Sequence, residues 1–319
     1  NRTTPLVVAI VAAYGLTMPK TSLRAITSPA GTADTMEVLT NVTLSSEEIT
    51  AVVEKEGGCF VWGGTAQLSP ADDVLIKIEK ALDIDSEGQL IASVLSKKAA
   101  AGSTHVVIDI PVGETAKVRS MEMAKKLQNH METVGNAIDL NVKVIITDGL
   151  QPVGYGIGPT LEAIDILNVL KNEENAPKDL KERVMLLAGE LLELSGKVEK
   201  GKGMETAKEI LTSGKAYEKF LAICKAQGRF TQPVLAPYKT EIRAETSGIL
   251  KRIDNRKIAK LAKLSGAPQS KSAGILLNVH LNDKVEKDGL LYTLFAESQG
   301  ELNYALEYKN RHNDIITIK

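Results

Sequence analysis

The densest cluster of residues that could bind a ligand spans Lys20 to Asp34. It places the hydroxyl side chains of Thr27, Ser28 and Thr32 beside Gly31, just before a stretch with the composition of a helix. The N-terminus of a helix binds anions, and phosphate above all, because its backbone N–H groups have no partner within the helix. An ordinary N-cap at Thr32 after a tight turn explains the same spacing equally well. The sequence leaves both interpretations open.

A second candidate cluster lies on a predicted helix farther along the chain. Asp85-Ser86-Glu87 has the composition of a helix start, and apolar residues then recur at helical spacing. Ser93 and Lys97 are four residues apart, so they share one face and can bind one ligand together, unless that face is simply a solvated helix edge. A carboxylate at a helix start normally has a lowered pKa. A proton-donating role for Asp85 therefore requires surroundings that raise its pKa.

Metal ligands and disulfides are not indicated by the sequence. Cys59 and Cys224 are far apart, and neither has metal-ligand spacing around it. The histidines are scattered without the pairing of a metal site: His105, His130, His280 and His312. Gln151 to Gly158 is rich in glycine but lacks the spacing of a dinucleotide-binding fingerprint, so we interpret its glycines as a turn from a strand into a helix.

The composition is that of an ordinary globular protein of about two domains. Among 319 residues, 43% are apolar and 25% are charged, and 39 basic side chains face 40 acidic ones. A net charge of -1 excludes nucleic-acid binding by bulk electrostatics, and the apolar content excludes disorder. The apolar run from Pro5 to Tyr14 is too short to span a bilayer. The low cysteine content favours a cytoplasmic location.

The order of predicted elements is that of an α/β fold. Thr4-Pro5 predicts the start of a buried helix that ends at Gly15, and Ser45-x-x-Glu48 has the spacing of a capping box. Apolar runs without polar alternation predict buried strands at 59–62, 104–110 and 142–147, and helical stretches are expected at 116–138 and 159–171. Alternating strands and helices predict a mainly parallel central sheet flanked by helices.

Changes in composition and the positions of glycine and proline divide this fold into parts. We expect residues 1–69 and 102–227 to form an α/β phosphate-binding domain, and residues 70–101 to belong to a helical lobe. Frequent glycines and prolines then separate short alternating runs, which predicts a smaller C-terminal α+β domain at 228–319. Because the chain starts at Asn1 and enters a helix almost at once, we expect an N-terminal part of the protein to precede it.

The segment from Ser22 to Glu37 resembles the signature of the thymidine and pyrimidine-nucleoside phosphorylase family. It shares Arg24, the Gly31-Thr32 pair, Asp34 and the final glutamate at the family's spacing, and Leu23 departs from the usual Gly or Ser. Further similar segments follow in the family's order: Leu68 to Asp72, Ser93 to Lys98 and Val106 to Ile110. The sequence is most similar to the AMP phosphorylase branch, whose bacterial relatives are called type 2 thymidine phosphorylases.

The resemblance assigns roles to individual positions. It implies that Asp85 is the proton donor and that the nucleotide is bound by Leu23, Arg24, Ala25, Ile26, Thr27, Ser28, Thr32, Ser93 and Lys117. The spacing from Ser93 adds Lys97 to the candidate binding residues. It implies phosphate contacts from Thr4, Ser22 and Thr32, and in some members a monovalent cation held at Val153, Gly156 and Asp165. The family's glycine-rich Lys-His-Ser loop, which also holds phosphate, would lie upstream of Asn1.

The resemblance further implies a pentosyltransferase that cleaves an N-glycosidic bond with inorganic phosphate as co-substrate and without another cofactor. Glu79 and Lys80 occupy the neighbourhood where pyrimidine-specific members have a base-binding arginine, which favours a nucleoside 5′-monophosphate such as AMP. Thymidine phosphorolysis is the alternative, and binding of a nucleotide without turnover is a second one. We expect a homodimer or larger homo-oligomer with small-molecule ligands, and neither a nucleic-acid nor a membrane partner.

Overall fold

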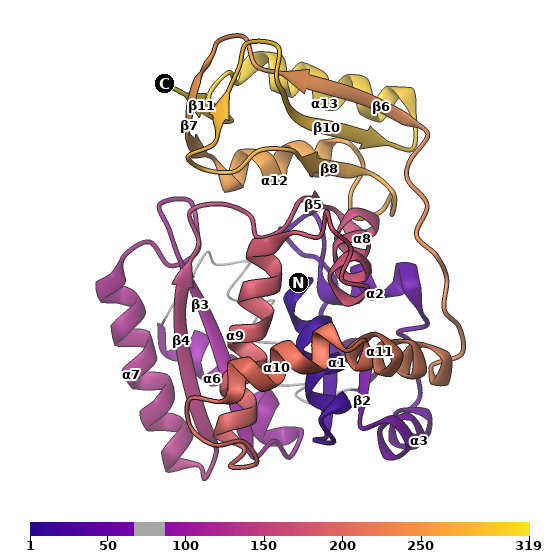
Figure 1. Ribbon diagram of the computed structural model, residues 1–319, viewed down its shortest axis with the longest axis vertical. Coiled ribbons are helices and arrows are strands. Elements are labelled where there is room, and N and C mark those ends of the chain that lie inside the picture. Colours follow the sequence, from indigo (N-terminus) through magenta and orange to yellow (C-terminus); the bar gives the residue numbers. More distant parts are fainter. Residues whose placement is uncertain (67–86) are drawn as a thin grey trace.

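The computed structural model describes residues 1–66 and 87–319 of the chain. Figure 1 shows a larger lobe, formed by the elements up to residue 226, and a C-terminal lobe, formed by residues 238–319, above it. An extended segment along one side joins the two lobes. Among the described residues, no helix is both long and apolar enough to cross a membrane.

The larger lobe contains two pairs of parallel strands. β1 (Met18–Ser22) pairs with β2 (Gly58–Trp62), and β3 (His105–Val112) pairs with β4 (Asn141–Asp148). The three strands that the apolar runs predict are confirmed as β2, β3 and β4, and so is the α/β class. β1 was not predicted, because its residues, Met18-Pro19-Lys20-Thr21-Ser22, have no strand-like pattern. The carboxyl ends of β3 and β4 point toward the C-terminal lobe (Figure 1).

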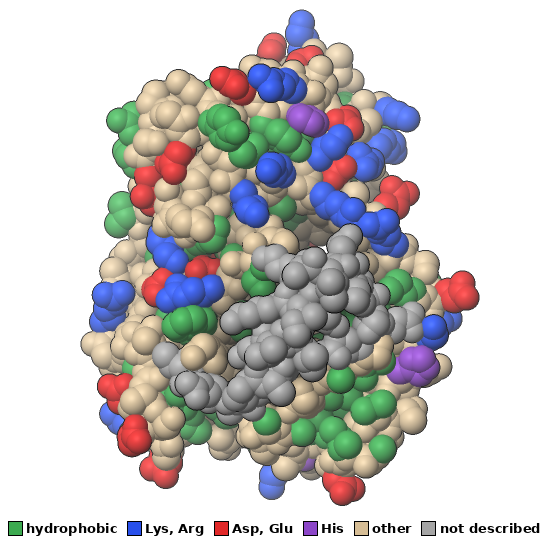
Figure 2. Space-filling model, turned by 180° about the vertical axis from the view of Figure 1, so that it is seen from behind, with side chains coloured by type: hydrophobic (Ala, Val, Ile, Leu, Met, Phe, Trp, Pro, Cys, Tyr) green, Lys and Arg blue, Asp and Glu red, His purple; other side chains and the backbone are tan. Residues whose placement is uncertain are grey.

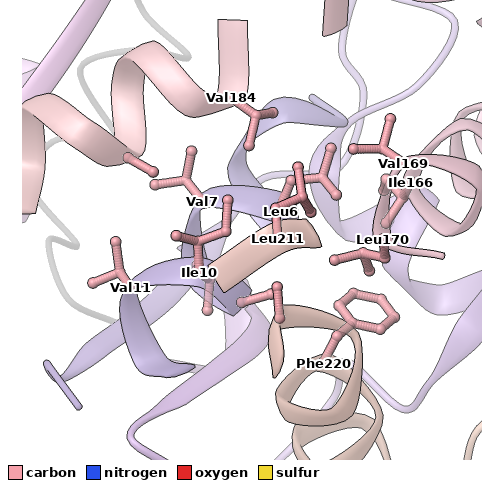
Figure 3. Close-up of a cluster of buried hydrophobic side chains, with 14 of the residues drawn as sticks. Leu6, Val7, Ile10, Val11, Ile166, Val169, Leu170, Val184, Leu211 and Phe220 are labelled. Atoms are coloured by element: carbon pink, nitrogen blue, oxygen red, sulfur yellow. The ribbon is translucent and has the colours of Figure 1, made fainter. Parts of the chain in front are cut away.

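A buried helix forms the centre of the larger lobe. α1 (Thr3–Ala13) is apolar on nearly every side, and Leu6 and Ile10 are completely buried. Figure 3 shows these side chains packed against residues of four other helices. These helices are α8 (Pro159–Leu170), α9 (Lys178–Leu194), α10 (Gly203–Thr212) and α11 (Lys215–Ala226). α1 begins two residues earlier than expected, because Arg2 rather than Thr4 occupies its N-cap position.

Local caps set the ends of the shorter helices. The capping box before α3 (Ser46–Glu56) is confirmed: Ser45 Oγ accepts from the Glu48 N–H at 3.2 Å, and the Glu48 carboxylate accepts from the Ser45 N–H at 2.7 Å. The helix expected from residue 116 begins later, as α7 (Met121–Ala137), because Ser120 is its N-cap. Lys117 therefore lies in the loop before α7. The other helices among the described residues of this lobe are α2 (Thr32–Leu39), α4 (Gly63–Ala66) and α6 (Glu87–Ala100).

The C-terminal lobe is the expected α+β structure with its own apolar core. One antiparallel sheet runs in the order β5 (Gly156–Ile157), β8 (Gly274–Leu277), β10 (Leu290–Ala296) and β6 (Tyr238–Arg243). The other runs in the order β11 (Ile316–Ile318), β7 (Gly248–Ile253) and β9 (Lys284–Val285). Two helices accompany these sheets, α12 (Asn255–Leu264) and α13 (Gln299–Arg311).

The expected division into domains stays a prediction. The three largest apolar clusters of the described residues lie around α1 and α8 to α11, around β3, β4, α6 and α7, and in the C-terminal lobe. α6 packs on α7 and shares its cluster with β3 and β4. The segment that was expected to begin a helical lobe at residue 70 lies largely outside the described residues, as does Leu68 to Asp72.

Candidate functional site

A cavity of about 500 Å³ lies between the two lobes, at the carboxyl ends of β3 and β4. Pro111 and Asp148 contribute its wall from the strands, and α12 contributes Asn255 from the C-terminal lobe. Of the predicted site residues, Lys117 of the loop before α7 and Val153 line this cavity. Pro29 of the signature segment and Leu90 and Val94 of α6, which were not predicted, line the same space. Ligands of α/β folds commonly bind at the carboxyl ends of parallel strands.

Asp34 organises the signature segment at the N-terminus of α2. Its side chain is only 4% exposed, and its Oδ2 atom accepts hydrogen bonds from the backbone N–H groups of Ala25 at 2.6 Å and Gly31 at 3.0 Å. The two ends of the loop from residue 25 to residue 31 are thus bound to one carboxylate. Gly31, not Thr32, is the N-cap residue of α2, so the predicted helix start is confirmed with its cap one residue earlier.

Arg24 is held by neighbouring acids. Its guanidinium makes two hydrogen bonds to Glu37, at 2.6 and 2.7 Å, and a longer one to Asp34 at 3.4 Å, and it lies 5.0 Å from the centre of the Trp62 ring. The bond from Arg24 lowers the pKa of Glu37 to about 2, and Lys271 contributes in the same direction. The positive charge of Arg24 is therefore balanced within the protein.

The predicted hydroxyl groups lie in different surroundings. Thr32, 9% exposed, donates to the Asn1 carbonyl at 3.3 Å, and Ser22 donates to the Val61 carbonyl at 3.2 Å. Ser28 donates to the Ala30 carbonyl, Thr27 is exposed, and Thr4 is half-buried in the first turn of α1. Leu23 and Ile26 are also exposed. Their ligand contacts, like that predicted for Ala25, stay predictions.

The second predicted cluster is described only in part. Asp85, together with Glu79 and Lys80, lies outside the described residues. Ser93 and Lys97 are half-buried on α6, the helix whose Leu90 and Val94 line the cavity. Ser93 itself is not among the residues that line the cavity. The binding roles of Ser93 and Lys97 stay predictions.

The glycine-rich turn after β4 is built around Asp165 of α8. The Asp165 Oδ2 atom accepts from the backbone N–H groups of Tyr155 at 2.9 Å and Gly156 at 2.8 Å, and from the Arg2 guanidinium at 2.5 Å. Arg2 thus lies beside the carboxylate where the resemblance implies a monovalent cation. Among the residues that the structure describes, no group of three or more His, Cys, Asp or Glu side chains could hold a metal. The cation role of Val153, Gly156 and Asp165 stays a prediction.

A polar network in the wall of the cavity was not predicted from the sequence. Asp109 of β3 accepts from Thr147 at 2.5 Å and from the Arg183 guanidinium at 3.1 Å, and Arg183 also donates to the Asp148 carbonyl at 2.7 Å. A charged residue within the apolar run of β3 was the available signal. Asn255 of α12 was missed as well. Its Nδ2 donates to the Gly149 carbonyl at 2.9 Å, while its buried Oδ1 has no partner in the described part of the chain.

Positive charge surrounds this region. Seen from behind, Lys and Arg side chains gather across the face where the two lobes meet (Figure 2). α12, whose Ala259 lines the cavity, carries the exposed residues Arg256 and Lys260. Burial lowers the pKa of Lys20 in β1 to about 8, and the nearby charge of Lys98 adds to this shift. An anionic ligand would relieve such repulsion.

The sequence matches two families. Residues 3–217 match the glycosyl transferase family, a/b domain, and residues 249–315 match the pyrimidine nucleoside phosphorylase C-terminal domain. The chain belongs to the thymidine and pyrimidine-nucleoside phosphorylase family. The boundary between the two matches lies near the boundary between the two lobes, and the resemblance of the signature segment is confirmed.

Two relatives are similar to this chain in sequence, and one solved structure is similar to it in fold. Proteins of Hahella chejuensis (strain KCTC 2396) and Legionella pneumophila (strain Corby), which carry the provisional name thymidine phosphorylase, are each 57% identical over the whole chain. The chain spans only 63% and 62% of their lengths. The fold is similar to anthranilate phosphoribosyltransferase of Thermus thermophilus, with a TM-score of 0.55, 21% identity and coverage of 70% of this chain and 73% of that one.

Proposed function

We propose that this chain forms the site of a phosphorylase that cleaves the N-glycosidic bond of a nucleoside or nucleoside 5′-monophosphate. One observation carries the proposal: the signature loop, α6 and Lys117, which are far apart in the sequence, line one cavity at the carboxyl ends of β3 and β4. The membership in the family supports the same reaction. Small-molecule substrates and phosphate are the ligands that fit such a site.

In the proposed reaction, an oxygen of inorganic phosphate attacks the anomeric carbon of the sugar. The bond from this carbon to the base nitrogen breaks, and its electron pair leaves with the base, which takes up a proton. Asp85 is the predicted source of that proton. The products are the free base and a pentose 1-phosphate, so atoms and charge balance without a redox step. The transition state carries positive charge on the sugar, which an anion beneath the sugar stabilises.

Two substrate classes fit the site, and they differ in the need for positive charge. Lys117 is exposed at the cavity and forms no ion pair with the residues that the structure describes, so it is available for a 5′-phosphate. This favours AMP. Arg24 does not add to the argument, because Glu37 and Asp34 already balance its charge. The names of the relatives favour thymidine, which is the second candidate.

The reaction is tested by measuring whether the intact protein releases base from its substrate only when inorganic phosphate is present. Adenine from AMP and thymine from thymidine are measured by chromatography with and without inorganic phosphate, and kcat/KM is compared. Lys117→Ala should narrow a preference for AMP about tenfold or more, because a charge-assisted hydrogen bond contributes about 1.5–3 kcal/mol. Lys125→Ala, an exposed lysine on α7, is the matched control. A preference for thymidine would select the second candidate, and no release from either substrate would reject phosphorolysis and favour nucleotide binding without turnover.

The assembly and the location of the protein are further parts of this proposal. We infer a homodimer or larger homo-oligomer, which light scattering of the purified protein would test. A cytoplasmic location is the other inference. It is supported by two buried, unpaired cysteines and is testable by cell fractionation.

A further inference from the structure

Lys271 reaches from the C-terminal lobe to the signature segment. Its ammonium group lies 3.2 Å from the Asp34 carboxylate and 2.9 Å from the Glu37 carboxylate. Asp34 is the residue that binds both ends of the loop from residue 25 to residue 31. A side chain of one lobe is thus bonded to the residue that shapes the predicted phosphate loop of the other.

The backbone of Lys271 is fixed at the same junction. Its carbonyl accepts from the N–H of Thr160, in the first turn of α8, at 3.0 Å. Three residues later Gly274 begins β8, which pairs with β5 just before α8. α8 in turn packs against α2, where the Thr35 hydroxyl lies 3.4 Å from the Glu162 carboxylate. The backbone of Lys271 is therefore held beside α8, and its side chain extends from there to α2.

We propose that Lys271 is a positioning residue that couples the C-terminal lobe to the phosphate loop. It holds the Asp34 carboxylate in the orientation that closes the loop from Ala25 to Gly31. It also balances charge, since two cations, Arg24 and Lys271, face two carboxylates, Asp34 and Glu37. Without Lys271 this group carries a net negative charge beside the helix start where phosphate is expected, and that charge opposes anion binding.

The role of Lys271 in phosphate binding rests on the proposed function, but its effect on the loop does not. Two measurements on the intact protein separate the two. Hydrogen exchange at the amides of Ala25 and Gly31 reports whether the loop stays closed. Calorimetric titration with inorganic phosphate, together with KM for phosphate and kcat in the phosphorolysis assay, reports the consequence for the ligand.

Lys271→Met keeps the length of the side chain and removes its charge. We expect faster exchange at both amides, phosphate affinity reduced about tenfold or more, and a higher KM for phosphate with kcat changed less than about threefold. Lys271→Arg should restore both the slow hydrogen exchange at the two amides and the affinity for phosphate. Lys284→Met is the matched control, because Lys284 lies on the same lobe with its side chain 82% exposed in an ion pair with Glu286.

Each contrary result has a distinct meaning. Unchanged exchange in Lys271→Met would overturn the positioning role, and unchanged phosphate affinity would overturn the coupling to the anion. Failure of Lys271→Arg to restore both would also overturn the proposal, because the loss would then not come from the charge. If the wild-type protein binds phosphate and releases no base, the proposed function fails, while exchange and titration still decide the role of Lys271.

Discussion

Replacing Gly31 by alanine tests the geometry of the signature loop most directly. A Cβ atom at Gly31 would lie 2.5 Å from the carbonyl oxygen of Leu23, 2.7 Å from the nitrogen of Ala25 and 2.8 Å from the carbonyl carbon of Arg24. All three are backbone atoms, which cannot rotate away as the end of a flexible side chain can. The segment from 23 to 25 must therefore move outward by several tenths of an ångström.

The size of the effect follows from these contacts. Overpacking of this kind costs about 1–3 kcal/mol. The same movement stretches the 2.6 Å bond from the Ala25 N–H to Asp34, and loss of a hydrogen bond to a charged group costs about 1.5–3 kcal/mol. The two costs overlap, because both arise from one displacement, so we expect Gly31→Ala to lower the free energy of unfolding by about 2–4 kcal/mol.

Urea unfolding followed by circular dichroism measures this loss, and phosphate titration measures its effect on the loop. The matched control is Gly300→Ala on α13, where an added Cβ has no heavy atom within 4 Å. In an exposed helix this change should be neutral or stabilise by up to about 1 kcal/mol. Equal stability of the two variants, with phosphate affinity unchanged in Gly31→Ala, would refute the close approach of Gly31 to the segment from 23 to 25.

Three further predictions concern titration and chemistry. Asp85→Asn should lower kcat about a hundredfold or more with nucleotide binding nearly intact, as for a lost general acid, and equal losses in binding and turnover would indicate a structural cap instead. Burial lowers the pKa of Lys20 from 10.5 to about 8, so between these pH values the unfolded chain binds more protons than the folded chain. The free energy of unfolding should therefore rise with pH from about 8 to 10.5, and Lys20→Met should flatten this rise in urea unfolding. The pKa of Glu37 is lowered from 4.5 to about 2, so the stability that its ion pairs contribute is present above pH 4.5 and is lost as the pH falls through 2. Glu37→Gln should therefore lose less stability than the wild type over this range, and parallel curves of unfolding free energy against pH would contradict the pairing with Arg24.

The parts of the fold that were predictable depend on short-range signals. The capping box at Ser45 and Glu48 fixes the start of α3 with contacts three residues apart, and apolar runs identify β2, β3 and β4 because both faces of these strands are covered. β1 was missed for the converse reason. Its sequence, from Met18 to Ser22, has neither an apolar run nor a regular alternation, and only its pairing with β2 makes it a strand.

The candidate site was predictable only where a family motif marks it. The signature segment indicates an anion site at Gly31-Thr32, but it does not show that Glu37 and Asp34 balance the charge of Arg24. Asp109 and Asn255 have no motif around them. They enter the site because β3, β4 and α12, which are far apart in the sequence, meet at one cavity.

The contact between Lys271 and Asp34 shows why local sequence could not complete the site. Spacing within one element can place two side chains on a common face, but 237 positions separate these two residues. They meet because the Lys271 carbonyl accepts a hydrogen bond from the first turn of α8, and because α8 packs against α2. The charge of Asp34 in the signature segment is balanced by Lys271 of the C-terminal lobe, and the signature motif alone does not predict this partner. It follows that the C-terminal lobe contributes to the surroundings of Asp34, beside the predicted anion site.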